Sequence, residues 1–155
     1  MSKTTHITIE GTPKSLKRHR HTRNGHTYNP SAGDMKEVRS LVSIATPSSP
    51  PKGLISLITI FYMPRPKSHY RTGKYADLLK DTAPDLHSNK PDLDNLIKFV
   101  CDTFNGVLWE DDKQIAFINA YKIYDESPRT EITIHEHDND KVMEEFNLDD
   151  IRGEA

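Results

Sequence analysis

The sequence of 155 residues is long enough to bury one hydrophobic core and too short for two. It is 34% apolar and 28% charged, and it has no apolar run that predicts a membrane-spanning helix or a signal-peptide start. The single cysteine, Cys101, excludes an internal disulfide framework and a multi-cysteine zinc site, and it favours a reducing cytosol. The net charge of −2 does not exclude a polyanionic partner, because the last 20 residues hold eight acids and two bases and leave residues 1–135 at +4.

The first third of the chain predicts one strand, one long loop and one helix. Residues 5–10 alternate in polarity, which is typical of a short strand. Residues 11–30 show no periodicity and are rich in Lys, Arg, His, Asn and Gly, so they predict a long polar loop. Residues 31–45 carry an apolar stripe at helical spacing, and Ser31 or Asp34 is expected to cap this helix.

The long loop is the candidate site for phosphate contacts. Between Lys14 and Arg23 it contains five bases and no acid, a density that backbone binding to nucleic acid needs. The candidate DNA contacts are Lys14, Lys17, Arg18, Arg20 and Arg23. From charge alone, a solvated basic loop fits equally well. A zinc site at His19, His21 and His26 is the weaker interpretation, because no fourth ligand has a suitable spacing.

The middle of the chain predicts a central strand followed by a polar excursion. Residues 54–63 are rich in β-branched and aromatic side chains, and the prolines that follow end the strand. Residues 65–90 are polar and basic, with a helical turn expected over residues 75–80. The candidate DNA contacts in this segment are Lys67, Arg71 and Lys74.

The most regular segment predicts a helix over residues 93–104. Its apolar side chains recur at i, i+3, i+4, i+7, i+8 and i+11, which places them on one continuous stripe. Pro91-Asp92 precedes the helix and Asn105-Gly106 closes it. Cys101 lies on the apolar stripe and is expected to be buried and inert.

Two strands and an acidic tail complete the chain. Residues 115–124 and 130–135 predict a hairpin, and residues 136–155 predict a peripheral tail, helical in part or flexible, outside a domain of residues 1–135. The order strand, helix, strand, helix, strand, strand predicts a single small α+β domain, with two helices packed on a mixed four-stranded sheet. The low apolar fraction favours a partner subunit that completes the buried surface.

Acidic residues flank the predicted helix and form a candidate catalytic centre. Asp94 and Lys98 are i,i+4 neighbours on one helix face, and Asp92 can join them only from the turn before the helix. Asp112 precedes the next strand, whose start can meet the start of the helix, and three carboxylates would then surround one point. Mg²⁺ prefers such oxygen ligands and activates water for phosphodiester hydrolysis. In this interpretation Lys98 contacts the phosphate or the water.

The same residues also fit ordinary structural roles. Asp92 is a good helix cap, Asp94 suits the first turn of a helix, and Asp94–Lys98 is a common surface pair. Asp111 and Asp112 could be turn residues. Spacing alone therefore leaves a metal centre and a set of helix caps as open alternatives.

The combination of two motifs resembles the RusA family of Holliday junction resolvases, which are common in phages and prophages. The first motif is DLDNLIK at residues 92–98, and the second is WEDDKQI at residues 109–115. Supporting similarities are the opening strand with its basic loop, HTYNP at residues 26–30 and YMPRPKS at residues 62–68. The resemblance covers roughly residues 5–135. The segment between Ser68 and Lys90 is longer than in the most compact members, and the acidic tail has no counterpart that aligns.

The resemblance implies a homodimeric enzyme that uses Mg²⁺, or Mn²⁺ in its place, to resolve four-way DNA junctions by paired nicks. It implies no membrane association and no small-molecule cofactor. The implied essential residues are Asp92, Asp94, Asp112 and Lys98, with Asp111 as a further candidate ligand. Symmetric cutting of a two-fold junction independently favours a two-fold dimer.

Two competing functions stay open at this point. One is a metal-dependent nuclease that prefers flaps or forks. The other is a non-catalytic DNA-binding protein in which the aspartates only cap and solvate. In each case the basic segments are expected to read DNA shape, because phosphate contacts carry little sequence information.

Overall fold

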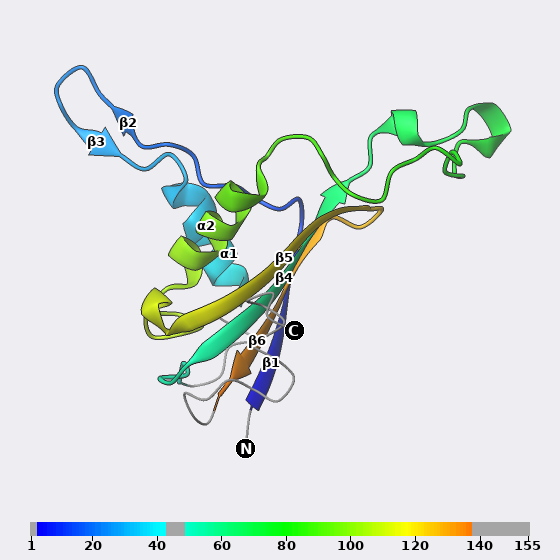
Figure 1. The fold of residues 1–155 in the computed structure, drawn as a ribbon. Coiled ribbons are helices and arrows are strands. Elements are labelled where there is room, and N and C mark those ends of the chain that lie inside the picture. Colours follow the sequence, from blue (N-terminus) through cyan, green and yellow to red (C-terminus); the bar gives the residue numbers. More distant parts are fainter. Residues whose placement is uncertain (1–2, 43–48, 138–155) are drawn as a thin grey trace, which may run out of the picture.

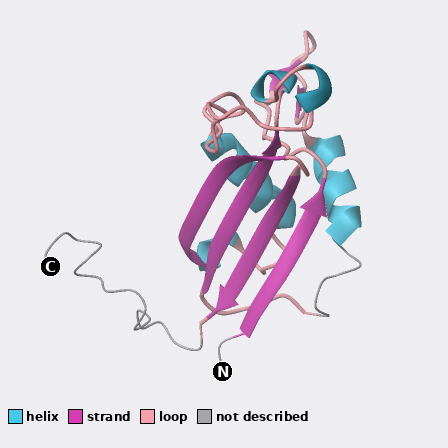
Figure 2. Cartoon of the chain, turned by 90° about the vertical axis from the view of Figure 1, so that its right-hand side faces the viewer, coloured by secondary structure: helices cyan, strands magenta, loops and turns pink. Residues whose placement is uncertain are grey.

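The central feature of the fold is a mixed four-stranded sheet with two helices packed on one face (Figures 1 and 2). This is seen in a computed structural model, which describes residues 3–42 and 49–137. The strands are β1 (Lys3–Glu10), β4 (Ile55–Pro64), β5 (Ile115–Asp125) and β6 (Arg129–Glu136), and the helices are α1 (Ala32–Val42) and α2 (Leu93–Phe104). The predicted fold class, a small α+β domain with two helices on a mixed sheet, is confirmed.

The strand order is β1-β6-β4-β5, and it corrects one prediction. The expected hairpin between the last two strands is wrong, because β4 lies between them: it pairs in parallel with β5 and antiparallel with β6. Nine of the ten residues of β4 are buried or half-buried, and only Pro64 is exposed, which is typical of a central strand. The connection from β4 to β5 passes through α2, which makes that pair parallel.

The helices bury the apolar stripes that the sequence indicates. The predicted bounds of α2 are confirmed, and Gly106, with φ of 76°, follows its end in a left-handed conformation. Arg39 of α1 donates to the carbonyl oxygens of Thr103 (2.6 Å) and Asp102 (3.3 Å), which ties the last turn of α2 to α1. The largest fully buried side chains are Trp109, Phe61, Phe104, Ile55, Leu57, Leu96, Leu108, Ile132 and Val42.

Two arms project from the same end of the domain, on either side of the N-terminal end of α2 (Figure 1). The β2–β3 arm, residues 18–30, contains the short paired strands β2 (Arg20–His21) and β3 (Thr27–Tyr28). The 65–90 arm contains two 3₁₀ turns, Lys67–His69 and Gly73–Tyr75. The sequence predicts a loop without strands for the first arm. For the second arm it predicts a helical turn over residues 75–80, slightly after the observed turn Gly73–Tyr75.

Some predictions concern residues outside the described ranges. The end of the first predicted helix, residues 43–45, and residues 138–155 of the predicted acidic tail lie there. Within the described ranges, no helix combines the length and apolar character needed to cross a bilayer.

Candidate active site

The turn before α2 presents Asp92 without using its side chain as a helix cap. Asp92 occupies the N-cap position with extended φ/ψ of −69° and 143°, and its main-chain carbonyl accepts the N–H groups of Asn95 (3.1 Å) and Leu96 (3.2 Å). Its carboxylate makes no capping hydrogen bond and is exposed. The structural alternative for this residue, a side-chain cap, is therefore not realised.

Asp94 and Lys98 form an exposed pair on α2. The Lys98 Nζ lies 3.4 Å from Asp94 Oδ2, and the side chains are 60% and 65% exposed. Exposed i,i+4 pairs stabilise a helix by only a few tenths of a kcal/mol. Both side chains can therefore exchange this contact for a ligand at little cost.

The second acidic motif divides into one structural and one candidate functional residue. Asp111 caps the 3₁₀ turn Asp112–Gln114, accepting the Lys113 N–H (2.9 Å), while the Gln114 side chain accepts the Asp111 N–H (2.7 Å). Gln114 is buried and donates to the carbonyl oxygens of Pro51 and Gly53. Asp111 thus belongs to a capping box that fixes the start of β5.

Asp112 is oriented by an aromatic side chain. The buried indole Nε1 of Trp109 donates to Asp112 Oδ1 at 2.7 Å, which leaves Oδ2 for another partner. Burial, and then the negative charges of Asp112 and Asp102, raise the pKa of Cys101 to about 11. Cys101 is consequently a protonated thiol near neutral pH, and Asp112 lies close to this part of α2.

The three candidate carboxylates do not form one cluster in the isolated chain. In residues 3–42 and 49–137, no group of three or more His, Cys, Asp or Glu side chains is arranged to hold a metal ion. Cys101, whose pKa responds to the charge of Asp112, lies seven residues after Asp94 on α2, which is about 10 Å along the helix axis. Asp92 and Asp94 nevertheless fit Mg²⁺ by chemistry, because this ion often takes one or two carboxylates and keeps several waters.

Lys122, which the sequence interpretation missed, holds the chain immediately before Asp92. Its Nζ donates to the carbonyl oxygens of Asn89 (2.6 Å) and Pro91 (2.8 Å). On the other side, the Leu16 N–H donates to the carbonyl oxygen of Asn95 at 3.0 Å. The start of α2 is thus fixed from β5 and from the N-terminal loop. The feature of the sequence that could have indicated this role is Lys122 itself, a lysine within the otherwise mostly uncharged strand β5.

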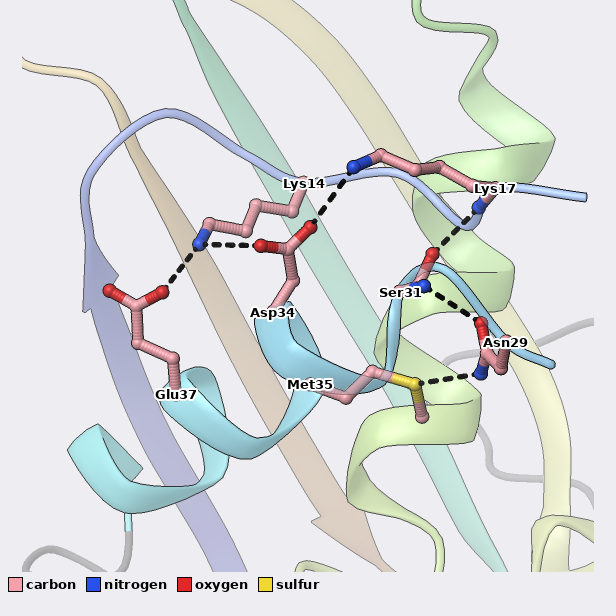
Figure 3. A network of polar contacts seen from close by, with 7 residues as sticks. All are labelled: Lys14, Lys17, Asn29, Ser31, Asp34, Met35 and Glu37. Carbon is pink, nitrogen blue, oxygen red and sulfur yellow. Dashed lines mark hydrogen bonds and ion pairs between the residues drawn. The ribbon is translucent and has the colours of Figure 1, made fainter.

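The base of the β2–β3 arm is an ion-pair network with α1 (Figure 3). Lys14 Nζ lies 2.8 Å from Glu37 and 3.3 Å from Asp34, and Lys17 Nζ lies 3.5 Å from Asp34. The hydrogen bond to Glu37, with Asp34 next to it, raises the pKa of Lys14. Two of the five candidate DNA contacts in this segment are therefore already engaged with acids of the protein.

Ser31 closes the base of the same arm (Figure 3). Its buried hydroxyl accepts the Lys17 N–H at 2.8 Å, and its own N–H donates to the Asn29 side chain at 2.9 Å. The two ends of the arm are consequently joined where it leaves the domain.

The outer part of the β2–β3 arm carries the free cations. Arg18, Arg20 and Arg23 are exposed, and none of them forms an ion pair with another described residue. His21 contacts the Thr27 hydroxyl at 2.9 Å. The arm's histidines form no metal-binding group with other described residues, so the zinc interpretation receives no support.

The root of the 65–90 arm is packed around Tyr124. The rings of His69 and His87 each lie 4.7 Å from the Tyr124 ring, and the Arg65 guanidinium lies 5.6 Å from it. Asn89 donates to the Tyr124 hydroxyl at 3.2 Å. The root therefore has several contacts to β5, and it leads directly into the turn that carries Asp92.

Residues 85–87, where the arm returns to the domain, also pair with the edge of β5. The Tyr124 N–H donates to the Asp85 carbonyl (2.8 Å), and the His87 N–H donates to the Lys122 carbonyl (3.0 Å). Arg65, whose side chain is 7% exposed, donates to the Pro84 carbonyl at 2.8 Å. Of the candidate DNA contacts here, Lys67 is exposed, Arg71 pairs with Asp81 at 3.4 Å, and Lys74 lies 5.1 Å from the Tyr75 ring.

Exposed carboxylates at a helix start, set between two cationic arms, are typical of a protein that binds and hydrolyses a nucleic-acid backbone. Residues 10–135 match the model of the family described as Endodeoxyribonuclease RusA, and the chain belongs to this family. It is also similar to the uncharacterized protein YqaN of Bacillus subtilis (strain 168), with 30% identity over 140 residues that cover 84% of this chain and 94% of YqaN. Membership places the chain among endodeoxyribonucleases.

Proposed function

We propose that the protein is a Mg²⁺-dependent, structure-selective endodeoxyribonuclease that resolves four-way DNA junctions as a homodimer. The observation that carries the proposal is the turn before α2, where an exposed Asp92 that does not cap the helix adjoins the exposed Asp94–Lys98 pair. Family membership supplies the reaction class. Four-way branched DNA is the proposed substrate, and Mn²⁺ is a substitute for Mg²⁺.

Each residue has a defined role in this proposal. Asp92 and Asp94 would hold the ion, and Asp112, oriented by Trp109 but set apart from them along α2, would join them only through a change of arrangement when DNA or a second protomer binds. Bound Mg²⁺ polarises the phosphoryl group and lowers the pKa of the attacking water. Lys98 would leave Asp94 for the phosphate and place its positive charge where negative charge develops in the transition state.

A two-fold dimer supports the proposed outcome of the reaction. A four-way junction is resolved by two nicks related by two-fold symmetry, and a C₂ dimer presents two identical sites in that relation. Each of the two sites would use the same set of carboxylates.

The test compares wild type with Asp94→Asn and with Asp102→Asn, a matched exposed aspartate on the same helix. A labelled four-way junction is incubated with and without Mg²⁺, and binding and cleavage are followed together. Wild type and Asp102→Asn should make paired nicks only with the metal. Asp94→Asn should bind the junction but cut at least about 100-fold more slowly, because a metal ligand has lost its charge.

Two results would contradict the proposal. Faster cutting of flaps or forks than of the junction would assign the chain to a different substrate class. Junction binding without cleavage under any divalent metal would make it a DNA-binding protein whose aspartates have structural roles only.

A further inference from the structure

Exposed apolar side chains are concentrated on the 65–90 arm. Of the seven large apolar side chains that are exposed in the described residues, four lie on this arm, at Tyr75, Leu78, Leu79 and Leu86. The first three, with exposed fractions of 49%, 51% and 36%, lie within residues 73–80, which we call the arm tip. An apolar cluster at the end of a polar arm requires a partner to cover it.

The arm tip is ordered by its own backbone. The Arg71 N–H donates to the Leu78 carbonyl (2.8 Å), and the Lys80 N–H donates to the His69 carbonyl (2.9 Å), so the two sides of the arm are paired. The Leu78 N–H closes the turn on the Tyr75 carbonyl at 2.9 Å. The leucines are therefore held outward by a defined turn, which lowers the entropic cost of inserting them into a partner.

The charge around the arm tip selects the kind of partner. Residues 65–90 hold six Lys or Arg and three Asp, a net charge of +3. Arg71, Lys74 and Lys80 flank the apolar residues in the sequence, and Lys74 lies over the Tyr75 ring. Lysines are depleted from the apolar centre of protein interfaces, whereas apolar side chains flanked by cations are the usual means of inserting into stacked bases.

We propose that the arm tip inserts Leu78 and Leu79, with Tyr75, between bases at the branch point of the DNA junction. This inference rests on the proposed function and deepens it by assigning a residue set to junction selectivity. Unstacking a base step costs a few kcal/mol in duplex DNA and less where pairing is already interrupted. A branch point therefore accepts the wedge more readily than a continuous duplex does.

The position of the arm fits this role. Its root packs on Tyr124 and leads through Asn89 and Pro91 directly to Asp92. In Figure 1 the arm leaves the end of β4, extends away from the helices and returns to the start of α2, so its tip lies at the same end of the domain as the helix start that carries Asp92 and Asp94.

The experiment compares wild type with the double variant Leu78→Ser/Leu79→Ser. Leu41→Ser is the matched control, because Leu41 is an exposed leucine (56%) on α1, away from the arm. The probe is a four-way junction carrying 2-aminopurine at the branch point, measured without divalent metal so that it is not cut. Wild type and Leu41→Ser should raise the fluorescence, and the double variant should not. The preference for junction over linear duplex should fall at least about tenfold in the double variant, as expected for the loss of an apolar wedge between bases.

Three outcomes would overturn the inference. A fluorescence rise in the double variant equal to that of wild type would show that the tip does not unstack the branch point. A change from dimer to monomer in the double variant, measured by light scattering, would assign the tip to a contact with a second copy of the chain. If wild type cuts the junction with Mg²⁺ and never raises the fluorescence, the inference fails while the proposed function stands.

Discussion

The β2–β3 arm and the 65–90 arm lie on either side of the start of α2 and differ in what fixes them to the domain. The first is joined through Ser31 and through ion pairs of Lys14 and Lys17, and its outer arginines contact no described acid. The second is packed on the Tyr124 ring, paired with the edge of β5 and closed by its own turn.

This difference separates two ways of recognising DNA. Exposed arginines without an acidic partner bind any phosphate backbone, and their affinity depends on salt. An ordered arm with an apolar end responds to the shape of the nucleic acid and to the ease of deforming it. The first arm should therefore supply general affinity, and the second should supply selectivity and a rigid connection to the carboxylates.

Among the variants of the two arms and their roots, the largest effect is expected where the second arm joins the candidate site. Lys122→Met removes the two hydrogen bonds that hold the carbonyl oxygens of Asn89 and Pro91, so the turn that carries Asp92 should lose its fixed position. Residues that orient metal ligands typically contribute 10- to 100-fold, so we expect kcat for junction cleavage to fall by at least about tenfold. Single-turnover kinetics over a range of Mg²⁺ concentrations would measure it.

Two controls separate positioning by Lys122 from a general loss of structure. Lys113→Met removes an exposed lysine of the 3₁₀ turn before β5 and should leave kcat unchanged. Lys122→Arg keeps a donor and should recover part of the rate. If Lys122→Met lowers the melting temperature substantially and the Mg²⁺ dependence of its remaining activity is that of wild type, a positioning role is contradicted.

The next effect concerns charge on the first arm. Replacing Arg18, Arg20 and Arg23 with Ala should lower the slope of log affinity against log salt concentration by about 2.7, because three phosphate contacts are lost. Preference for junction over duplex should change little. Binding titrations at several salt concentrations would measure both quantities. Lys14→Met is the control, since Lys14 already pairs with Glu37, and a fall of about 0.9 in its slope, as for one lost phosphate contact, would contradict the comparison.

The smallest effect is a pH dependence at the root of the second arm. Burial, and then the charge of Lys122, lower the pKa of His87 below its ordinary value of 6.5. The unfolded chain therefore takes up the proton more readily, so this residue's contribution to stability is complete above pH 6.5 and is lost as the pH falls below it.

Melting temperatures between about pH 7.5 and about pH 5.5 would test this pH dependence. His87→Phe keeps a ring against Tyr124 but cannot titrate, so its melting temperature should fall less on acidification than that of wild type. An identical fall in both proteins would place the pH dependence elsewhere.

Local periodicity was enough to predict the two main helices and the strands, but not how the strands pair. The stripe of α2 and the apolar run of β4 are properties of single segments, and they were located almost to the residue. The partners of β5 and β6 depend on a third strand far away in the sequence, and a short connection wrongly favoured a hairpin. The β2–β3 pairing was missed although Asn24-Gly25 is a hairpin signal, because the flanking residues do not alternate.

The chemistry of the candidate site was easier to predict than its contacts. The motifs identified acids and a lysine of the appropriate types, but not that Asp111 forms a capping box while Trp109 orients Asp112. Likewise, a count of basic residues cannot show that Lys14 and Lys17 reach acids on α1, since that contact exists only in the folded chain.

The place of β6 in the sheet also has a consequence for synthesis of the protein. β1, at the beginning of the chain, pairs with β6 alone, and Lys3 lies opposite Glu136. While the chain is being made, β1 therefore has no partner until residues 129–136 have left the ribosome, because translation proceeds from the N-terminus. The sheet is completed only when its last strand enters between β1 and β4, so a truncated translation product lacking β6 leaves both of those strand edges open to aggregation.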